Sequence, residues 1–222
     1  MLVAPSTKEQ IVRVAERLLG ERGLEGVSLR QIGAAAGSGN NSAVQYHFGS
    51  KDVLIQAIFE YRLPDLNARR RLLIAERRPA DLRTWVECFA LPILELAEQD
   101  GSHYCTFVAM LAHHGRVDVV ERVPDEYKAS TRAFHDQFAA FLPHLPAPLR
   151  THRILQAMAF GVYAAADREL ARSGDQPVLP YAVYVSALFD GLVGFLQAPA
   201  SPTALAALDE TYTDRLTRAL FP

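Results

Sequence analysis

A helical spacing of apolar residues recurs along most of the chain. In the segment 7–21, Ile11 and Leu18 fall on one side of a helix at about 100° per residue, and Glu16 and Arg17 fall on the other. Alternation with a period of two, which would indicate strands, does not extend over several residues, and no hairpin turn separates β-branched runs. The pattern therefore predicts an all-α protein.

Capping signals mark the starts of the first two helices. Thr7 and Gln10 form a T-x-x-Q capping box that would open the helix at 7–21. Ser28 and Gln31 form a second capping box, which predicts a short helix at 28–36.

Two more helices are expected after the turn "GSGN". The third, at 41–48, ends at Gly49. The fourth begins at Lys51 after a cap at Ser50, and it is expected to end at Pro64 because proline disrupts the interior of a helix.

The remainder of the chain has the pattern of long helices separated by glycine and proline. The expected helices lie at 65–78, 80–99, 102–114, 125–142, 147–172, 180–198 and 203–220.

The third helix, in the stretch "NNSAVQYHFGSK", has a distinctive polar side. A solvated face would mix Glu, Lys and Arg, because these are good helix formers. Amides instead pair with adenine, hydroxyls adapt to several base edges, and an aromatic ring contacts the thymine methyl. A short capped helix, a glycine turn and a second short helix also form the helix-turn-helix arrangement, so the stretch predicts a major-groove reader. Its outward residues are Asn41, Ser42, Gln45 and Tyr46.

The first sixty or so residues resemble the TetR family of bacterial transcriptional regulators. The resemblance is carried by "IVRVAERLLGERGLEGVSLRQIGAAAG" and by "YHFGSKDVLIQAIFE", in which the run from Tyr46 to Lys51 is the most specific part. The turn in "SGNNSAVQ" is about one residue longer than the family pattern, so the register of the reading residues is defined to within one position. The resemblance implies a helix-turn-helix domain at 1–50, a connecting helix at 51–64, and a ligand-binding and dimerisation domain at 65–222.

Four further residues are candidates for DNA contacts. Lys51 lies in the first turn of a helix, where free N–H groups and a partial positive charge suit a phosphate. The family anchors on the DNA backbone near the start of the second helix, which implicates Ser28 and Arg30. His47 has two open interpretations, a packed histidine at the edge of the buried half or a phosphate contact.

The larger C-terminal region is expected to enclose a small-molecule effector. Its aromatic and soft residues could pack as a core, or, as the resemblance implies, line a largely apolar ligand cavity. The candidates are Trp85, Phe89, His103, Tyr104, Phe107, Met110, His114, Phe134, Phe138, Phe160 and Tyr163.

The helices at 147–172 and 180–198 are the candidates for a dimer interface. The stretch "AMAFGVYAAA" offers small residues that allow close approach of another helix, and "YVSALFDGLVGFL" is apolar on nearly all sides. A large interface of this kind resembles a domain core cut in half. In the TetR family the two helices pair with their copies, which implies a homodimer; a fully buried helix in a monomer is the alternative.

Several other classes of chemistry find little support. The net charge of −2 gives no global attraction to nucleic acid or membrane, and the two cysteines, Cys88 and Cys105, are expected to be buried free thiols. No histidine and carboxylate spacing suits a metal, "GSG" follows no strand, and no G-x-S-x-G elbow is present. No cofactor or membrane partner is expected, and "MLVAPSTKEQ" has no signal-peptide pattern, so the expected location is cytoplasmic.

The sequence therefore predicts a ligand-responsive DNA-binding regulator rather than an enzyme. In this interpretation a homodimer represses from a palindromic double-stranded operator, and a small, largely apolar molecule releases it. Two alternatives remain open, an all-helical enzyme acting on a hydrophobic small molecule and a sensor or scaffold of the same fold that no longer binds DNA.

Overall fold

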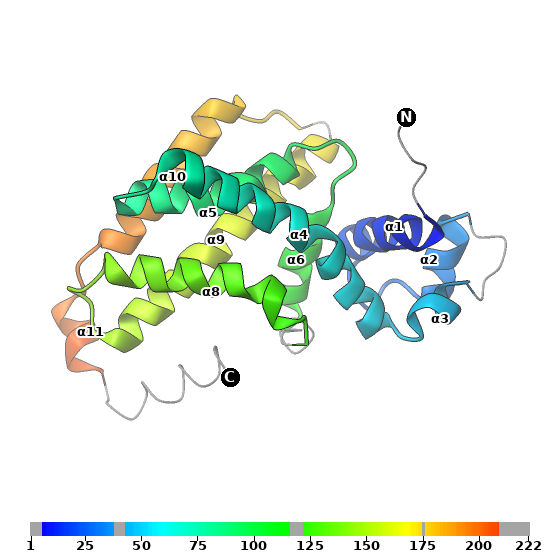
Figure 1. Cartoon of the computed structure of the whole chain (residues 1–222), viewed down its shortest axis with the longest axis horizontal. Helices are drawn as coiled ribbons and strands as arrows, with labels where there is room; N and C mark the ends of the chain where they lie inside the picture. Colours follow the sequence, from blue (N-terminus) through cyan, green and yellow to red (C-terminus); the bar gives the residue numbers. More distant parts are fainter. Residues whose placement is uncertain (1–5, 38–42, 116–121, 175, 209–222) are drawn as a thin grey trace. The chain divides into compact units, whose positions relative to one another are not determined.

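The computed structural model describes residues 6–37, 43–115, 122–174 and 176–208. Within these ranges the regular elements are helices and no strand occurs, which confirms the all-α prediction (Figure 1). The contacts between residues divide the chain into two compact units. Unit 1 comprises Met1–Arg69, Pro92–Lys128 and Val162–Val178, and unit 2 comprises Arg70–Leu91, Ala129–Gly161 and Leu179–Pro222.

Unit 1 begins with α1 (Thr7–Arg22), whose capping box differs from the predicted one. The cap is Ser6, which has an extended backbone and accepts from the backbone N–H of Glu9, while the Glu9 carboxylate accepts from Ser6 N at 2.7 Å. The prediction of a capping box at Thr7 and Gln10 was therefore wrong by one residue. The S-x-x-E pattern overlaps the T-x-x-Q pattern, and the Glu9 carboxylate is also stabilised by the positive end of the helix.

The next two helices are α2 (Leu29–Ala35) and α3 (Ala43–Phe48). The predicted capping box at the start of α2 is confirmed, because Ser28 Oγ accepts from Gln31 N and Gln31 Oε1 accepts from Ser28 N. Buried apolar side chains from these helices form the core of this part of unit 1. They include Ile11, Ala15, Leu19, Ile32, Val44 and Phe48.

The helix α4 (Lys51–Arg77) continues past the proline at which it was expected to end. Pro64 lies inside this helix, so the prediction of an end at Pro64 was wrong. A proline removes one backbone hydrogen bond and costs about 3 kcal/mol in a helix interior. Burial of Leu66 and Leu73 on the far side of Pro64 offsets this cost, and the helix ends only before Arg78 and Pro79.

The separate helix expected at 65–78 does not occur, because these residues form the second half of α4. The other helices follow the predicted positions to within a few residues, with one exception. The expected segment 203–220 contains α11 (Pro202–Ala206), which ends early, and residues 209–222 lie outside the described ranges. The remaining helices are α5 (Leu82–Ala97), α6 (Tyr104–His113), α8 (Asp125–Ala140), α9 (Ala147–Ser173) and α10 (Tyr181–Gln197).

The two cysteines are buried free thiols, as predicted. Burial raises the pKa of both Cys88 and Cys105, so neither thiol is activated as a nucleophile. Among the described helices, none is both long enough and apolar enough to span a membrane. The described residues also contain no group of three or more potential ligands that could hold a metal ion.

Candidate nucleic-acid interface and ligand pockets

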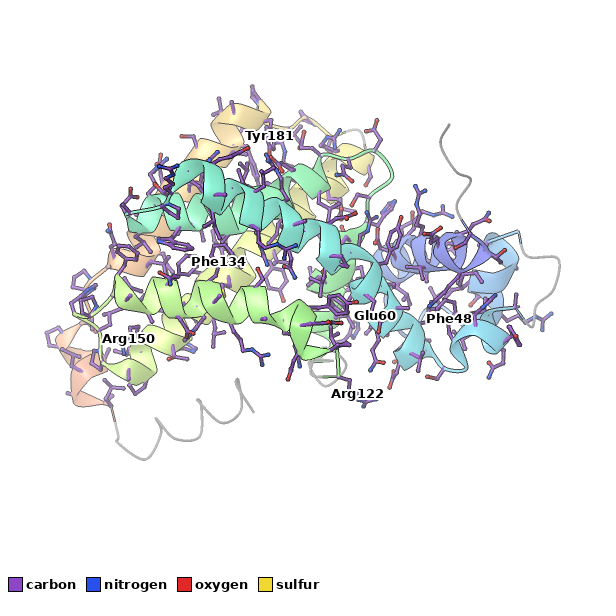
Figure 2. All side chains as sticks on the ribbon, viewed as in Figure 1. Phe48, Glu60, Arg122, Phe134, Arg150 and Tyr181 are labelled. Carbon is purple, nitrogen blue, oxygen red and sulfur yellow. The ribbon has the colours of Figure 1, made fainter. Side chains whose placement is uncertain are left out.

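The helix α3 has one buried side and one exposed side. Val44 is 1% exposed and Phe48, labelled in Figure 2, is also buried, whereas Tyr46 is 85% exposed. Gln45 is exposed as well. The structure therefore places Gln45 and Tyr46 on the outward side of α3, while Asn41 and Ser42 lie outside the described residues.

The end of α3 is held by one of these candidate reading residues. Gln45 Nε2 donates to the carbonyl oxygen of Gly49 at 2.7 Å, and Gly49 has a φ of 68°, a backbone conformation that favours glycine. His47 is exposed, and its ring centroid lies 5.2 Å from that of Tyr46. The interpretation of His47 as a packed, buried histidine is therefore wrong for this structure.

Lys51 and Arg30 differ in how they are held. Lys51 Nζ donates to the carbonyl oxygen of Leu24 at 2.7 Å, so it ties the start of α4 to the segment between α1 and α2. An ammonium carries three N–H groups, which leaves two for a phosphate. Arg30 is exposed on α2, and no hydrogen bond or ion pair joins its side chain to another described residue. Ser28 uses its side chain in the cap of α2.

A buried ion pair in unit 1 was missed by the sequence analysis. Glu16, expected on the polar side of α1, is only 1% exposed and accepts from Arg62 Nε at 2.6 Å and from Arg62 Nη2 at 2.7 Å. Glu16 also accepts from the backbone N–H of His103, just before α6. Burial would lower the pKa of Arg62, but the bond to Glu16 and its charge raise it above the ordinary value. No local pattern connects residues so far apart in sequence.

Four of the predicted ligand residues of unit 2 form a packed aromatic cluster. The ring centroids of Phe89 and Phe134 are 5.2 Å apart, and Trp85 and Phe138 make edge contacts with them at 5.7 and 5.8 Å. The buried Arg70 places its Cζ atom 4.4 Å from the centroid of the Phe89 ring. Such a cation over a ring, out of water, adds electrostatic attraction to the apolar packing.

The predicted ligand residues of unit 1 lie mostly around α1 and α6. Tyr104 and Phe107 are buried and pack against Phe59, with ring centroids 6.1 and 5.7 Å apart. His103 lies beside Glu21, with Nε2 4.0 Å from the carboxylate. Met110 and His114 lie close to the C-terminal cap of α1 at Gly23.

The last two predicted ligand residues, Phe160 and Tyr163, lie on the surface of α9. Within unit 2, Phe160 on α9 and Val183 and Phe195 on α10 are exposed apolar side chains. A Cβ atom built at Gly191 or Gly194 of α10 would meet nothing within 4 Å.

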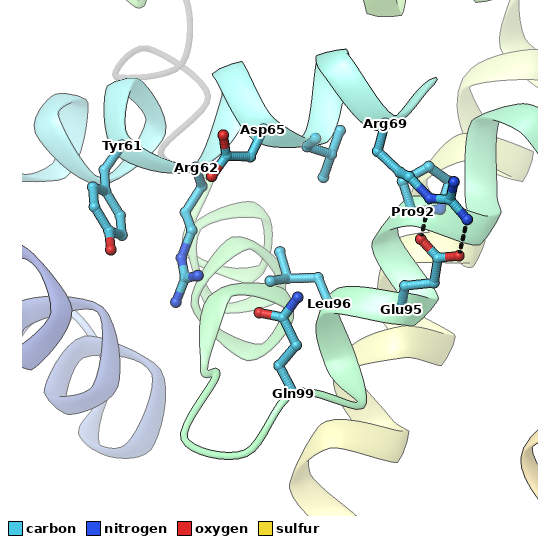
Figure 3. A pocket seen from close by; sticks show the side chains of 9 residues that line it. Tyr61, Arg62, Asp65, Arg69, Pro92, Glu95, Leu96 and Gln99 are labelled. Carbon is cyan, nitrogen blue, oxygen red and sulfur yellow. Dashed lines mark hydrogen bonds and ion pairs between the residues drawn. The ribbon is translucent and has the colours of Figure 1, made fainter. Parts of the chain in front are cut away.

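A polar pocket of about 260 Å³ opens in unit 1 beside α4 and α5, with none of the predicted ligand residues in its wall (Figure 3). Its wall combines two arginines and two carboxylates with apolar side chains. The lining residues are Tyr61, Arg62, Asp65, Leu66, Arg69, Pro92, Glu95, Leu96 and Gln99. A smaller pocket of about 90 Å³ in the same unit includes His103 and Glu169.

A short capped helix followed by a short helix with a buried apolar side and an exposed polar side, joined to long helices, defines the class of helix-turn-helix regulators. Comparison with protein-family models agrees. Residues 11–58 match the family described as "Bacterial regulatory proteins, tetR family", and residues 87–198 match "Tetracyclin repressor-like, C-terminal domain". The chain belongs to the TetR family, which confirms the resemblance seen in its sequence.

Solved structures share the fold. A transcriptional regulator from Rhodococcus sp. Rha1 is 20% identical, with a TM-score of 0.59, and the match covers 86% of this chain and 96% of that one. A TetR-family transcriptional regulator from Streptomyces coelicolor is 18% identical, with a TM-score of 0.55, and the match covers 86% and 94% of the two chains. No curated protein matches the chain. The likenesses concern the fold, and the family establishes a DNA-binding transcriptional regulator.

Proposed function

We propose that the chain is a homodimeric repressor that leaves its operator when a small molecule binds. The observation that carries this proposal is the two-sided character of α3, with Val44 and Phe48 buried and Tyr46 almost fully exposed. A helix of this kind can rest its apolar side on α1 and α2 while its polar side meets base edges in the major groove.

The proposed contacts divide into base reading and backbone positioning. Asn41, Ser42, Gln45 and Tyr46 would read base edges. Ser28, Arg30, His47 and Lys51 would position the protein on phosphates, which carry no sequence information themselves.

Dimerisation would set the spacing of the two reading helices. We assign the dimer interface to α9 and α10, because Phe160, Val183 and Phe195 are exposed apolar side chains and Gly194 leaves open space beside it. Two reading helices about 34–36 Å apart would meet successive major grooves, so the operator should be close to a palindrome.

The effector would bind in the C-terminal region, for which the aromatic cluster around Phe89 and Phe134 is the proposed apolar site. The ligand can shift the DNA-binding equilibrium only by its different affinity for the two states. The division at 1–50, 51–64 and 65–222 is retained as the proposed functional organisation, with α4 as the connection that continues through Pro64.

The test is a fluorescence-anisotropy titration of the full chain on the DNA upstream of its own gene. Salt-sensitive and sequence-preferring binding is expected. Replacing Gln45 and Tyr46 with Ala should weaken binding to the operator at least tenfold and binding to random duplex much less. Ala133→Ser, at an exposed position of α8, is the control. Equal loss on both duplexes, or no preference in the unaltered protein, would reject the proposal.

A further inference from the structure

The pocket beside α4 and α5 in unit 1 has charges of both signs along one side. Arg62, Asp65 and Arg69 follow one another at spacings of three and four on α4, so their side chains share a face of that helix. Glu95 lies opposite on α5 and forms a two-bond ion pair with Arg69, at 2.8 and 2.7 Å (Figure 3). The formal charges of these four wall residues cancel, so the wall offers both a cationic and an anionic partner to a ligand.

Two groups in the wall retain capacity for a ligand. Arg62 binds Glu16 through Nε and Nη2, which uses one edge of the guanidinium and leaves its outer edge, at Nη1 and Nη2, with N–H donors. Asp65 is an exposed residue of the wall, and no hydrogen bond or ion pair joins its carboxylate to another described residue. An unoccupied donor edge and an unoccupied acceptor group thus lie in one pocket.

The rest of the wall combines apolar side chains with Tyr61 and the Gln99 amide, and the pocket has a moderate volume. Leu66, Pro92 and Leu96 are buried among their neighbours and line the pocket, and the Tyr61 ring lies under the Arg62 guanidinium at 5.4 Å. A volume of about 260 Å³ suits a molecule of modest size with a short hydrocarbon part.

We propose that this pocket binds a small zwitterion of the amino-acid class. The ligand carboxylate takes the outer edge of Arg62, the ligand ammonium pairs with Asp65, and the hydrocarbon part contacts Leu66 and Leu96. Two parallel N–H bonds to one carboxylate give both strength and orientation. A molecule with only one of the two charges leaves Asp65 or the Arg62 edge without a partner.

Binding at this site acts on the contact between α1 and α4. A second carboxylate on Arg62 shares the cation with Glu16, and two anions on one cation repel each other. The bound ligand therefore weakens the hold of Arg62 on α1, which carries the helix-turn-helix region. This regulatory part rests on the proposed function, whereas ligand binding itself does not.

Calorimetry on the full chain tests binding without DNA. The probes are the individual proteinogenic L-amino acids, 4-aminobutyrate and 5-aminopentanoate. For the tightest of them, the same molecule without its amino group and the same molecule without its carboxylate are also titrated; for leucine these are 4-methylpentanoate and 3-methylbutylamine. The zwitterion is expected to bind at least tenfold more tightly than either analogue. Absence of binding by every probe at 10 mM, or equal binding of an analogue, would overturn the proposal.

Variants place the binding in this pocket. Asp65→Asn should weaken binding of the zwitterion at least tenfold. It should leave the affinity for the molecule without the amino group unchanged. Glu76→Gln, at an exposed position further along α4, is the matched control and should change neither. Equal affinities in the two variants would contradict the assignment. Asp65 is exposed, so its substitution does not disturb the core.

The DNA readout separates the two proposals. Saturating zwitterion should weaken operator binding at least fivefold, which is the lower end of typical coupling between sites. Zwitterion binding in a protein that binds no operator would reject the proposed repressor and support the pocket. Operator binding in a protein that binds no zwitterion would reject the pocket and support the repressor. Operator affinity unchanged by a bound zwitterion would overturn the regulatory part of the inference.

Discussion

The Glu16 carboxylate and the Arg62 guanidinium form a two-bond ion pair that joins α1 to α4, with N–O distances of 2.6 and 2.7 Å. Glu16 is 1% exposed and the Arg62 side chain is 16% exposed, so the pair is largely out of water. The backbone N–H of His103 adds a third bond to Glu16, at 3.2 Å. One carboxylate thereby holds together three segments of unit 1.

Removal of one partner should be strongly destabilising. Glu16→Leu leaves the Arg62 charge buried without its counter-charge, and we expect a loss of about 3–5 kcal/mol in the free energy of unfolding. The double variant Glu16→Leu/Arg62→Met should recover most of this loss, because both charges are then absent. Urea unfolding followed by circular dichroism measures both values.

The ion pair between Arg83 and Asp190 in unit 2 is the exposed comparison, with side chains 41% and 65% exposed. Arg83→Met should cost at most about 1 kcal/mol, because solvent screens this pair. A loss for Glu16→Leu no larger than that for Arg83→Met would contradict the structural role given to the buried pair.

The contrast between these two residues also shows what the sequence could not provide. The periodicity of α1 assigned Glu16 to its solvated side, as it would for most glutamates. Burial of Glu16 depends on Arg62 and on the approach of α6 at Gly20, where a Cβ atom would lie 3.3 Å from the carbonyl oxygen of His103. Contacts between residues so far apart leave no trace in a local pattern.

The local elements were predicted more reliably because local physics determines them. The capping box of Ser28 and Gln31 and the two sides of α3 depend on residues within one turn of each other. Pro64 failed as a stop signal for the opposite reason, since tertiary burial of Leu66 and Leu73 overrides a local preference. The polar pocket was missed because Asp65 and Glu95 come from different helices.

Asp81 should make a pH-dependent contribution to stability. Its carboxylate accepts from the backbone N–H of Thr84 at 2.9 Å and from the Thr84 hydroxyl at 3.0 Å, and these bonds lower the pKa of Asp81. The folded protein therefore favours the ionised form. This stabilisation is present above the pKa of the unfolded chain and is lost as the pH falls through the lower folded pKa.

Two substitutions separate the cap from the charge. Asp81→Ala should lower stability by about 1 kcal/mol near neutral pH, because the start of α5 loses its cap. Asp81→Asn keeps an acceptor but does not titrate, so its deficit relative to the parent should shrink as the pH is lowered below 4. Thermal unfolding between pH 3 and 7 measures the difference, and a deficit independent of pH would count against the role of the charge.

Arg78 should be a site where glycine stabilises the fold. It directly follows the last residue of α4 with a φ of 47°, in the left-handed region, and it precedes Pro79. A Cβ atom in this conformation is unfavourable by about 1 kcal/mol, and glycine avoids the clash. Arg78→Gly should therefore raise the unfolding free energy by about 0.5–1 kcal/mol.

Alanine is the matched control at this position. Arg78→Ala removes the same exposed side chain but keeps the Cβ atom, so it should give no gain. Chemical unfolding of the two variants checks the prediction. An equal gain in both would attribute the effect to the lost arginine charge rather than to the backbone.

Gly194 distinguishes stability of the single subunit from stability of the proposed dimer. A Cβ atom at Gly194 would meet nothing within 4 Å in the subunit, and the position is exposed on α10 beside Phe195. Gly194→Arg should therefore leave the subunit folded and even favour the helix by up to about 1 kcal/mol, since glycine is a poor helix former. In a dimer packed through α9 and α10, however, the long charged side chain would occupy space needed by the partner, and the dissociation constant should rise at least tenfold.

Sedimentation equilibrium over a range of concentrations measures the dissociation constant of the dimer. Ala133→Arg, at an exposed position of α8, introduces the same side chain elsewhere and should leave the constant unchanged. A folded Gly194→Arg protein that dimerises like the parent would place the interface on other helices.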